Sequence, residues 1–70
     1  MDLSKEEQEV LDNIREGITD SYQIQNFTHL SFEKIKLIFE KLEKLGFINI
    51  LRKHDQTYND EYWDCTLVKS

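Results

Sequence analysis

The middle of the chain carries apolar residues at the spacing of an α-helix, and this pattern ends at a glycine. These apolar residues lie within about 120° on a wheel that advances ~100° per residue. They are Ile35, Ile38, Phe39, Leu42 and Leu45. Ser31 precedes them as a side chain able to cap a helix, and Gly46 follows them. The pattern predicts a helix over residues 31–45 that buries one face.

The residues after Gly46 favour β-strands. The runs 47–51 and 62–68 are rich in β-branched and aromatic residues, and in the second run Trp63, Cys65 and Leu67 alternate with polar residues. Between the runs, the polar stretch 54–61 contains the turn-forming pair Asn59-Asp60. We therefore expect an antiparallel pair near 47–53 and 61–68. Because two strands alone are marginally stable, this hairpin must pack on the helices.

Two further helices are predicted before residue 31. Ser4 and Glu7 have the spacing of a capping box, so a first helix is expected over residues 4–16, ending at Gly17. Thr19 or Asp20 can cap a second helix over residues 20–27. On this second helix the residues expected to face inward are Tyr22, Ile24 and Phe27.

The predicted core combines apolar residues from every element. Trp63 and Cys65 are expected on the inner face of the hairpin. The other residues that we expect to be largely buried are Leu11, Ile14, Ile24, Ile35, Phe39, Leu42, Ile48 and Leu67.

Length and composition indicate one small folded domain over residues 1–70. Apolar residues make up 39% and charged residues 33% of the chain, which suits a globular domain and not a disordered one. No apolar run approaches the ~18 residues of a membrane span, and from the acidic N-terminus we expect no secretory signal. The single cysteine excludes an internal disulfide and fits a reducing compartment. We expect a cytoplasmic protein without membrane association.

No pattern in the sequence indicates catalysis. The chain has no glycine-rich phosphate loop and no Ser/His/Asp order typical of a hydrolase. His29 and His54 are isolated, and with one cysteine they do not have the spacing of metal ligands. We therefore expect a protein that is not an enzyme and that uses no metal or cofactor.

Two segments resemble the winged helix-turn-helix family. Residues 24–35 read IQNFTHLSFEKI and residues 42–48 read LEKLGFI, close to the family pattern I-A-x-x-T-G-L-S-x-x-x-V followed by L-x-x-L-G-hydrophobic-I. The resemblance covers about residues 5–68 and implies an α+β fold: three helices followed by a two-stranded antiparallel β-wing. The chain departs from the pattern at Gln25, where alanine is usual, and at His29, where glycine is usual. Both departures predict a slightly more open contact between the second and third helices.

The resemblance implies a small stand-alone transcription regulator that binds double-stranded DNA as a homodimer. In such domains the third helix enters the major groove and the wing lies on the phosphate backbone. The first helix or the hairpin edge would supply the dimer interface. The residues expected to contact DNA are Ser31, Lys34, Lys36, Leu37, Lys41, Arg52, Lys53 and His54.

The distribution of charge favours an alternative. The net charge of the chain is −5. The net charge of residues 1–20 is −5, that of residues 21–53 is +3, and that of residues 54–70 is −3. A protein that grips phosphates usually has a strong basic surface. The alternative is a protein-interaction module, either an adaptor or a phage or viral inhibitor of a host protein. Its contact residues would be Phe32, Glu33, Leu37 and Glu40 on the outward face of the third helix. A third interpretation is an ordinary solvated face with the ion pairs Glu33–Lys36 and Glu40–Lys44.

Overall fold

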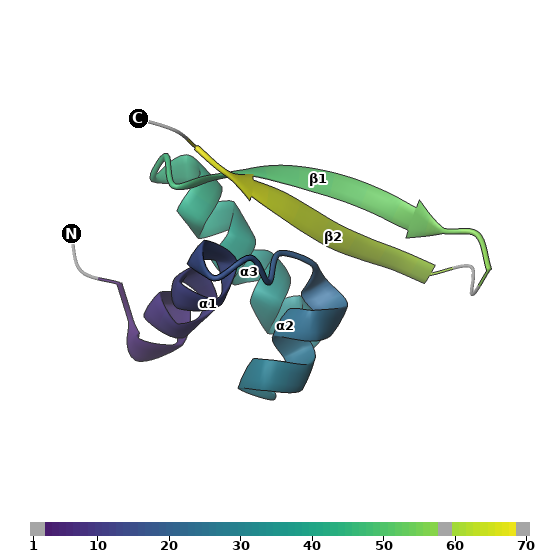
Figure 1. The fold of residues 1–70 in the computed structure, drawn as a ribbon, viewed down its shortest axis with the longest axis horizontal. Coiled ribbons are helices and arrows are strands. Elements are labelled where there is room, and N and C mark those ends of the chain that lie inside the picture. Colours follow the sequence, from purple (N-terminus) through teal and green to yellow (C-terminus); the bar gives the residue numbers. More distant parts are fainter. Residues whose placement is uncertain (1–2, 58–59, 69–70) are drawn as a thin grey trace.

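The computed structural model describes residues 3–57 and 60–68, with His54, Asp55 and Asp60 described by their backbone alone. Three helices precede a two-stranded antiparallel sheet, which confirms the expected α+β class and matches a winged-helix layout (Figure 1). The elements are α1 (Lys5–Arg15), α2 (Ser21–Thr28), α3 (Phe32–Lys44), β1 (Ile48–Asp55) and β2 (Asp60–Leu67). The helices lie where the sequence predicts them, while β1 continues past the predicted end at residue 53.

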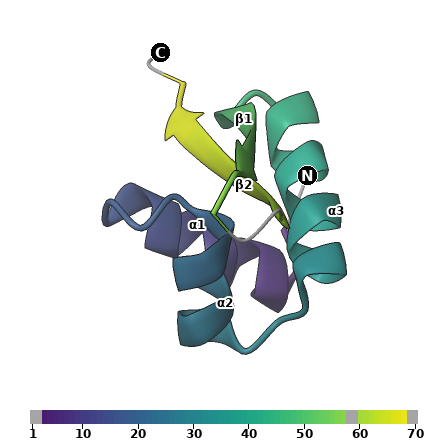
Figure 2. The ribbon, with the colours of Figure 1, turned by 90° about the vertical axis from the view of Figure 1, so that its right-hand side faces the viewer.

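The hairpin lies across the helices along the long axis of the molecule. Its turn end projects beyond α2 in the view of Figure 1, which gives the domain extents of 38 × 25 × 20 Å. Figure 2 shows α3 at the outer side of the helical layer, with no other element on its far side. One face of α3 is therefore open to solvent beside the projecting hairpin.

Polar side chains begin each helix. Ser4 Oγ accepts a hydrogen bond from the Glu7 N–H at 3.2 Å, and the Glu7 carboxylate accepts one from the Ser4 N–H at 2.7 Å, which confirms the capping box. Asp20, not Thr19, caps α2 through the N–H of Gln23 at 2.9 Å. Ser31 caps α3 through the N–H of Lys34 at 3.2 Å. These bonds satisfy backbone donors that a helix cannot pair internally.

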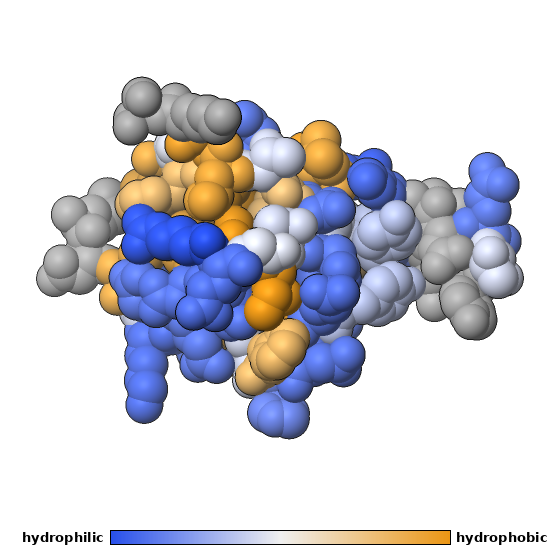
Figure 3. All heavy atoms as spheres, in the orientation of Figure 1, coloured by the Kyte–Doolittle hydropathy of each residue, from blue (hydrophilic) through white to orange (hydrophobic). Residues whose placement is uncertain are grey.

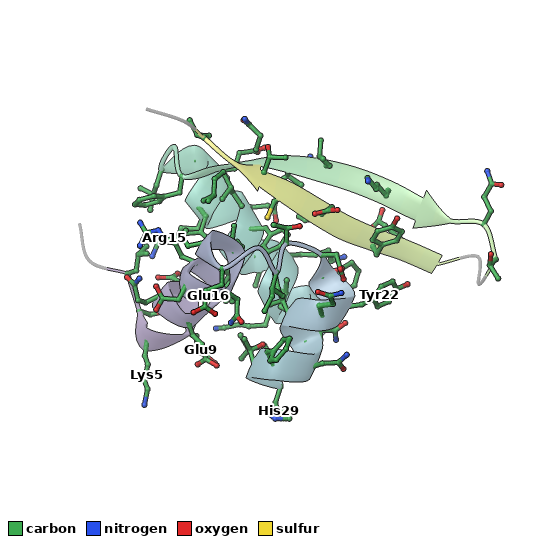
Figure 4. The ribbon with its side chains drawn as sticks, viewed as in Figure 1. Lys5, Glu9, Arg15, Glu16, Tyr22 and His29 are labelled. Atoms are coloured by element: carbon green, nitrogen blue, oxygen red, sulfur yellow. The ribbon has the colours of Figure 1, made fainter. Side chains whose placement is uncertain are left out.

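The turn between α2 and α3 places a non-glycine residue in the left-handed region. His29 has φ 61° and ψ 20°, and its side chain points away from the molecule (Figure 4). This is the position at which the winged-helix pattern has glycine. A left-handed conformation costs an L-residue roughly 1–2 kcal/mol, so this turn is strained.

The core joins all three helices to the inner face of the hairpin. The buried apolar residues are Val10, Leu11, Ile14, Ile24, Ile35, Ile38, Phe39, Leu42, Ile48, Trp63 and Cys65. The prediction for Leu67 is wrong, because this side chain is 42% exposed. Leu67 is the last residue of β2, and its ladder partner Ile48 is buried, so at this end of the hairpin the core covers β1 and leaves the side chain on β2 exposed. Figure 3 shows apolar side chains gathered at this end of the hairpin, where Leu67 and Val68 are both exposed.

The prediction that Tyr22 and Phe27 face inward is also wrong. Tyr22 is 42% and Phe27 is 61% exposed, whereas Ser21 and Ile24 are fully buried. Ser21 and Ile24 share the inward side of this two-turn helix. At helical spacing, Tyr22 and Phe27 then lie on the two opposite flanks of that side. Tyr22 instead stacks on Tyr62 of β2, with the ring centroids 5.4 Å apart. No helix within residues 3–57 and 60–68 has the length and apolar character needed to cross a bilayer.

Candidate interaction surface

The exposed side of α3 carries two carboxylates around a leucine. Glu33, Leu37 and Glu40 follow one another at helical spacing and therefore share a face. Leu37 is 64% exposed, the highest value among the large apolar residues that the structure finds exposed. Glu33 and Glu40 are exposed as well. We call these three residues the α3 strip. It combines negative charge with apolar surface.

A groove separates the α3 strip from the hairpin. It has a volume of about 330 Å³ and is lined by Glu33, Lys36, Leu37, Glu40, Arg52 and Trp63. Arg52 of β1 is the register partner of Trp63 of β2, so their side chains lie on the same face of the sheet. The hairpin therefore contributes a cation and an aromatic ring to a groove whose other wall is α3.

Two cations lie over the single tryptophan ring. The guanidinium carbon of Arg52 is 4.6 Å from the centroid of the Trp63 ring, and Lys36 Nζ is 5.9 Å from the same centroid. Lys36 Nζ is also 4.9 Å from the Phe32 ring and 3.5 Å from a carboxylate oxygen of Glu33. Cations are attracted to the negative face of an aromatic ring. The Trp63 ring thus holds both cations at the groove.

Phe32 does not lie on the outward face predicted for it. It is half-buried against the core, and its ring meets Trp63 edge-on, with centroids 6.5 Å apart and planes at 83°. Of the four residues predicted for protein contact, three form the α3 strip: Glu33, Leu37 and Glu40. The fourth, Phe32, instead contacts the ammonium group of Lys36 with its ring.

Lys34 and Lys41 point toward α1. Lys34 Nζ lies 3.4 Å from a carboxylate oxygen of Glu6, and Lys41 Nζ lies 2.9 Å from one of Glu7. Hydrogen bonds from the Ser4 N–H and from Lys41 lower the pKa of Glu7 below its ordinary value of 4.5. Both lysines are thus on the side of α3 away from the groove.

The other predicted DNA contacts are also dispersed. Lys53 adjoins Arg52 in β1 and so faces the opposite side of the sheet, with Nζ 3.9 Å from Asp64 Oδ2. The Ser31 hydroxyl caps α3, and the side chain of His54 lies outside the described residues. Of the eight residues predicted to contact DNA, the groove brings together Lys36, Leu37 and Arg52.

Trp63 is the site residue that sequence reasoning missed. The alternation of β2 places it correctly on the inner face, but its role depends on the partner across the ladder. Only the register shows that Arg52 lies opposite it. The predicted strand bounds, 47–53 and 61–68, did not specify that register.

The cysteine beside this site is held neutral. Burial, with a smaller contribution from the Asp64 charge, raises the pKa of the Cys65 thiol to about 12. The thiol donates to the carbonyl oxygen of Thr19 at 3.4 Å. Because the thiolate is the nucleophilic form of cysteine, Cys65 acts here as a small buried residue.

Comparison of the chain with models of protein families, with curated proteins and with solved structures gives no significant match. The observations that bear on function are therefore the groove and the α3 strip themselves.

Proposed function

We propose that this domain is a winged helix that serves as a protein-interaction module, with the α3 strip as its contact surface. The observation that carries the proposal is Leu37, 64% exposed between two exposed glutamates on the face of α3 beside the hairpin. In a DNA-binding winged helix this face would read base edges. Here it offers an apolar anchor within negative charge, which suits a protein partner with an apolar residue and nearby basic groups.

The apolar anchor gives such a contact a source of free energy. Fully burying a leucine side chain contributes roughly 1.5–3 kcal/mol. Glu33 and Glu40 flank it and would pair with lysine or arginine side chains of the partner, but they would repel phosphates. The same three residues therefore favour a protein and oppose a nucleic acid.

The positions of the lysines support the same conclusion. An exposed ion pair contributes only about 0–1 kcal/mol, so the pairs of Lys34 and Lys41 with α1 could be broken. Their direction matters more, because both leave α3 on the side of α1 and not of the groove. A phosphate backbone in the groove would meet the positive charges of Lys36 and Arg52. It would also meet the negative charges of Glu33 and Glu40, which cancel those positive charges.

One observation favours a second candidate, a DNA-binding transcription regulator. Arg52 and Lys36 lie side by side over Trp63, between α3 and the projecting hairpin. In the winged-helix arrangement the phosphate backbone passes near this place. On this candidate, Arg52 and Lys36 would contact phosphates and the glutamates would limit affinity.

A titration of a fluorescently labelled random-sequence duplex separates the two candidates. The proposal predicts no rise in anisotropy with wild-type protein at low salt up to about 100 μM, the weak end of nonspecific DNA binding. It predicts measurable, salt-sensitive binding by the double variant Glu33→Gln/Glu40→Gln, because the repelling charges are removed. Wild-type binding that weakens steeply with salt, and that Arg52→Gln abolishes, would instead establish the DNA-binding candidate.

A further inference from the structure

We infer that the groove between α3 and the hairpin is a carboxylate-binding site, which holds an acidic side chain of the partner protein on Arg52, with Lys36 beside it. This inference rests on the proposed function for the class of the partner. It assigns a ligand chemistry to Arg52 and Lys36, the two groove cations, which do not belong to the α3 strip.

Arg52 brings a guanidinium group to the groove. Its guanidinium carbon lies over the Trp63 ring, 4.6 Å from the centroid, and the hydrogen-bond donors of this group lie around its rim. No side chain within the described residues forms an ion pair with Arg52. A planar guanidinium matches the two oxygens of a carboxylate in a bidentate pair, and the contact with the Trp63 ring restrains its position.

Lys36 places a second positive charge beside the first. Both charges lie within 5.9 Å of the Trp63 centroid and therefore raise the positive potential in one part of the groove. Glu33 lies 3.5 Å from Lys36 on the helical side, while Arg52 has no such partner among the described residues. A carboxylate between Lys36 and Arg52 would relieve their mutual repulsion and neutralise the Arg52 cation, which pairs with no described carboxylate.

The ring of Trp63 lines the groove, while its indole N–H is buried. Its side chain is only 6% exposed, and its Nε1 has no hydrogen-bond partner within the described residues. Buried polar groups in folded proteins are nearly always hydrogen-bonded. Because the Nε1 atom itself has almost no exposed surface, it is not available to a ligand in the groove, and the binding of a carboxylate there rests on Arg52 and Lys36.

The charges of the groove favour one carboxylate over a phosphate group. Glu33 and Glu40 line the same groove, so a dianion or a chain of phosphates meets two negative charges as well as the two cations. A single carboxylate on a segment whose other residues are basic or apolar avoids this repulsion. The partner segment is therefore expected to place an acidic residue at Arg52, an apolar residue at Leu37 and basic residues near Glu33 and Glu40.

The test is an NMR titration of isotope-labelled protein with sodium acetate, with sodium chloride balancing the ionic strength. The chain has one tryptophan, so the indole N–H signal of Trp63 reports on the groove without ambiguity. We expect saturable shifts of this signal and of the Arg52 Nε–H. Affinity should fall at least tenfold in Arg52→Gln, fall less in Lys36→Gln, and stay unchanged in Lys44→Gln, which removes an exposed cation from the same helix.

Three results would overturn the inference. Shifts that do not saturate, or that sodium chloride reproduces, would show that the groove has no carboxylate site. An equal loss of acetate affinity in Arg52→Gln and Lys44→Gln would show that affinity depends on the overall charge of the protein and not on the groove. Tighter binding of inorganic phosphate than of acetate would make the groove a phosphate site. A dispersed Trp63 signal in each variant verifies the fold. The acetate titration contains no partner protein, so its result does not depend on the proposed function. The duplex titration can therefore refute the proposed function while acetate still binds, and acetate can fail to bind while the proposed function stands.

Discussion

The hydroxyl oxygen of Ser21, the first residue of α2, accepts a hydrogen bond from the backbone N–H of Trp63 at 3.1 Å. Ser21 is fully buried and is the one polar residue within the described core. The Trp63 N–H points away from β1 toward α2, so this bond fastens the hairpin to the helices. It also fixes the strand position from which Trp63 and Arg52 form the groove.

Replacing Ser21 with alanine leaves the buried Trp63 N–H without its acceptor. We expect Ser21→Ala to lower the free energy of unfolding by about 1–3 kcal/mol, the cost of an unsatisfied buried donor. Urea unfolding followed by Trp63 fluorescence measures this. Asn26→Ala, an exposed change on the same helix, should alter stability by less than about 0.5 kcal/mol. Equal stability of both variants would show that the bond is not formed.

Leu42 and Leu37 form a matched pair on α3, because Leu42 has no exposed surface and Leu37 is 64% exposed. Leu42→Ala should cost on the order of 2–5 kcal/mol, since it removes buried methyl groups and leaves a cavity. Leu37→Ala should change the free energy of unfolding by less than about 0.5 kcal/mol. Chemical denaturation of both variants is the measurement. A large loss for Leu37→Ala would mean that this residue belongs to the core.

The left-handed turn at His29 predicts a stabilising substitution. Glycine adopts φ 61° without strain, but it also increases the entropy of the unfolded chain. We expect His29→Gly to gain up to about 1 kcal/mol, which corresponds to a rise in Tm of about 4–8 °C for a domain of this size. His29→Val should lower Tm, because β-branched residues resist this region. Thermal unfolding that ranks valine above glycine would contradict the assigned conformation.

Much of the fold follows from local patterns in the sequence. Ser4 and Ser31 cap helices because their side chains act on backbone within three residues, and Ile35 and Phe39 are buried because a helix places them together. Such interactions are encoded over one or two turns. The predictions for Tyr22 and Phe27 failed because two helical turns hold too few apolar residues to define one inward face. The packing of α2 against the other elements decides instead which side is buried.

The candidate site depends on contacts that no local pattern encodes. Leu37, Glu33 and Glu40 are correctly predicted on an exposed face, since the face follows from the period of α3. The turn of Lys34 and Lys41 toward Glu6 and Glu7 depends instead on how α1 packs against α3. Likewise, Arg52 meets Trp63 only through the register of the hairpin.

The ion pair of Glu7 with Lys41 predicts a pH-dependent stability. The pKa of Glu7 is lowered in the folded state, so its contribution is present above pH 4.5 and is lost as the pH falls through the folded value. Glu7→Gln should therefore be less stable than wild type at pH 7, with the difference vanishing in acid. Glu9→Gln is the control, since Glu9 is exposed on the same helix (Figure 4). A difference that persists in acid would refute the pairing.

The proposed protein contact at Leu37 is tested most directly by photo-crosslinking in the cell. The photo-reactive residue p-benzoylphenylalanine is introduced at position 37 and, as a control, at position 27 on α2, where Phe27 is similarly exposed at 61%. After irradiation, we predict an adduct from position 37 that protease digests and nuclease leaves intact, stronger than any from position 27, and weakened by Glu33→Lys/Glu40→Lys. An adduct from position 37 that nuclease digests would contradict a protein contact and establish a nucleic acid at this face.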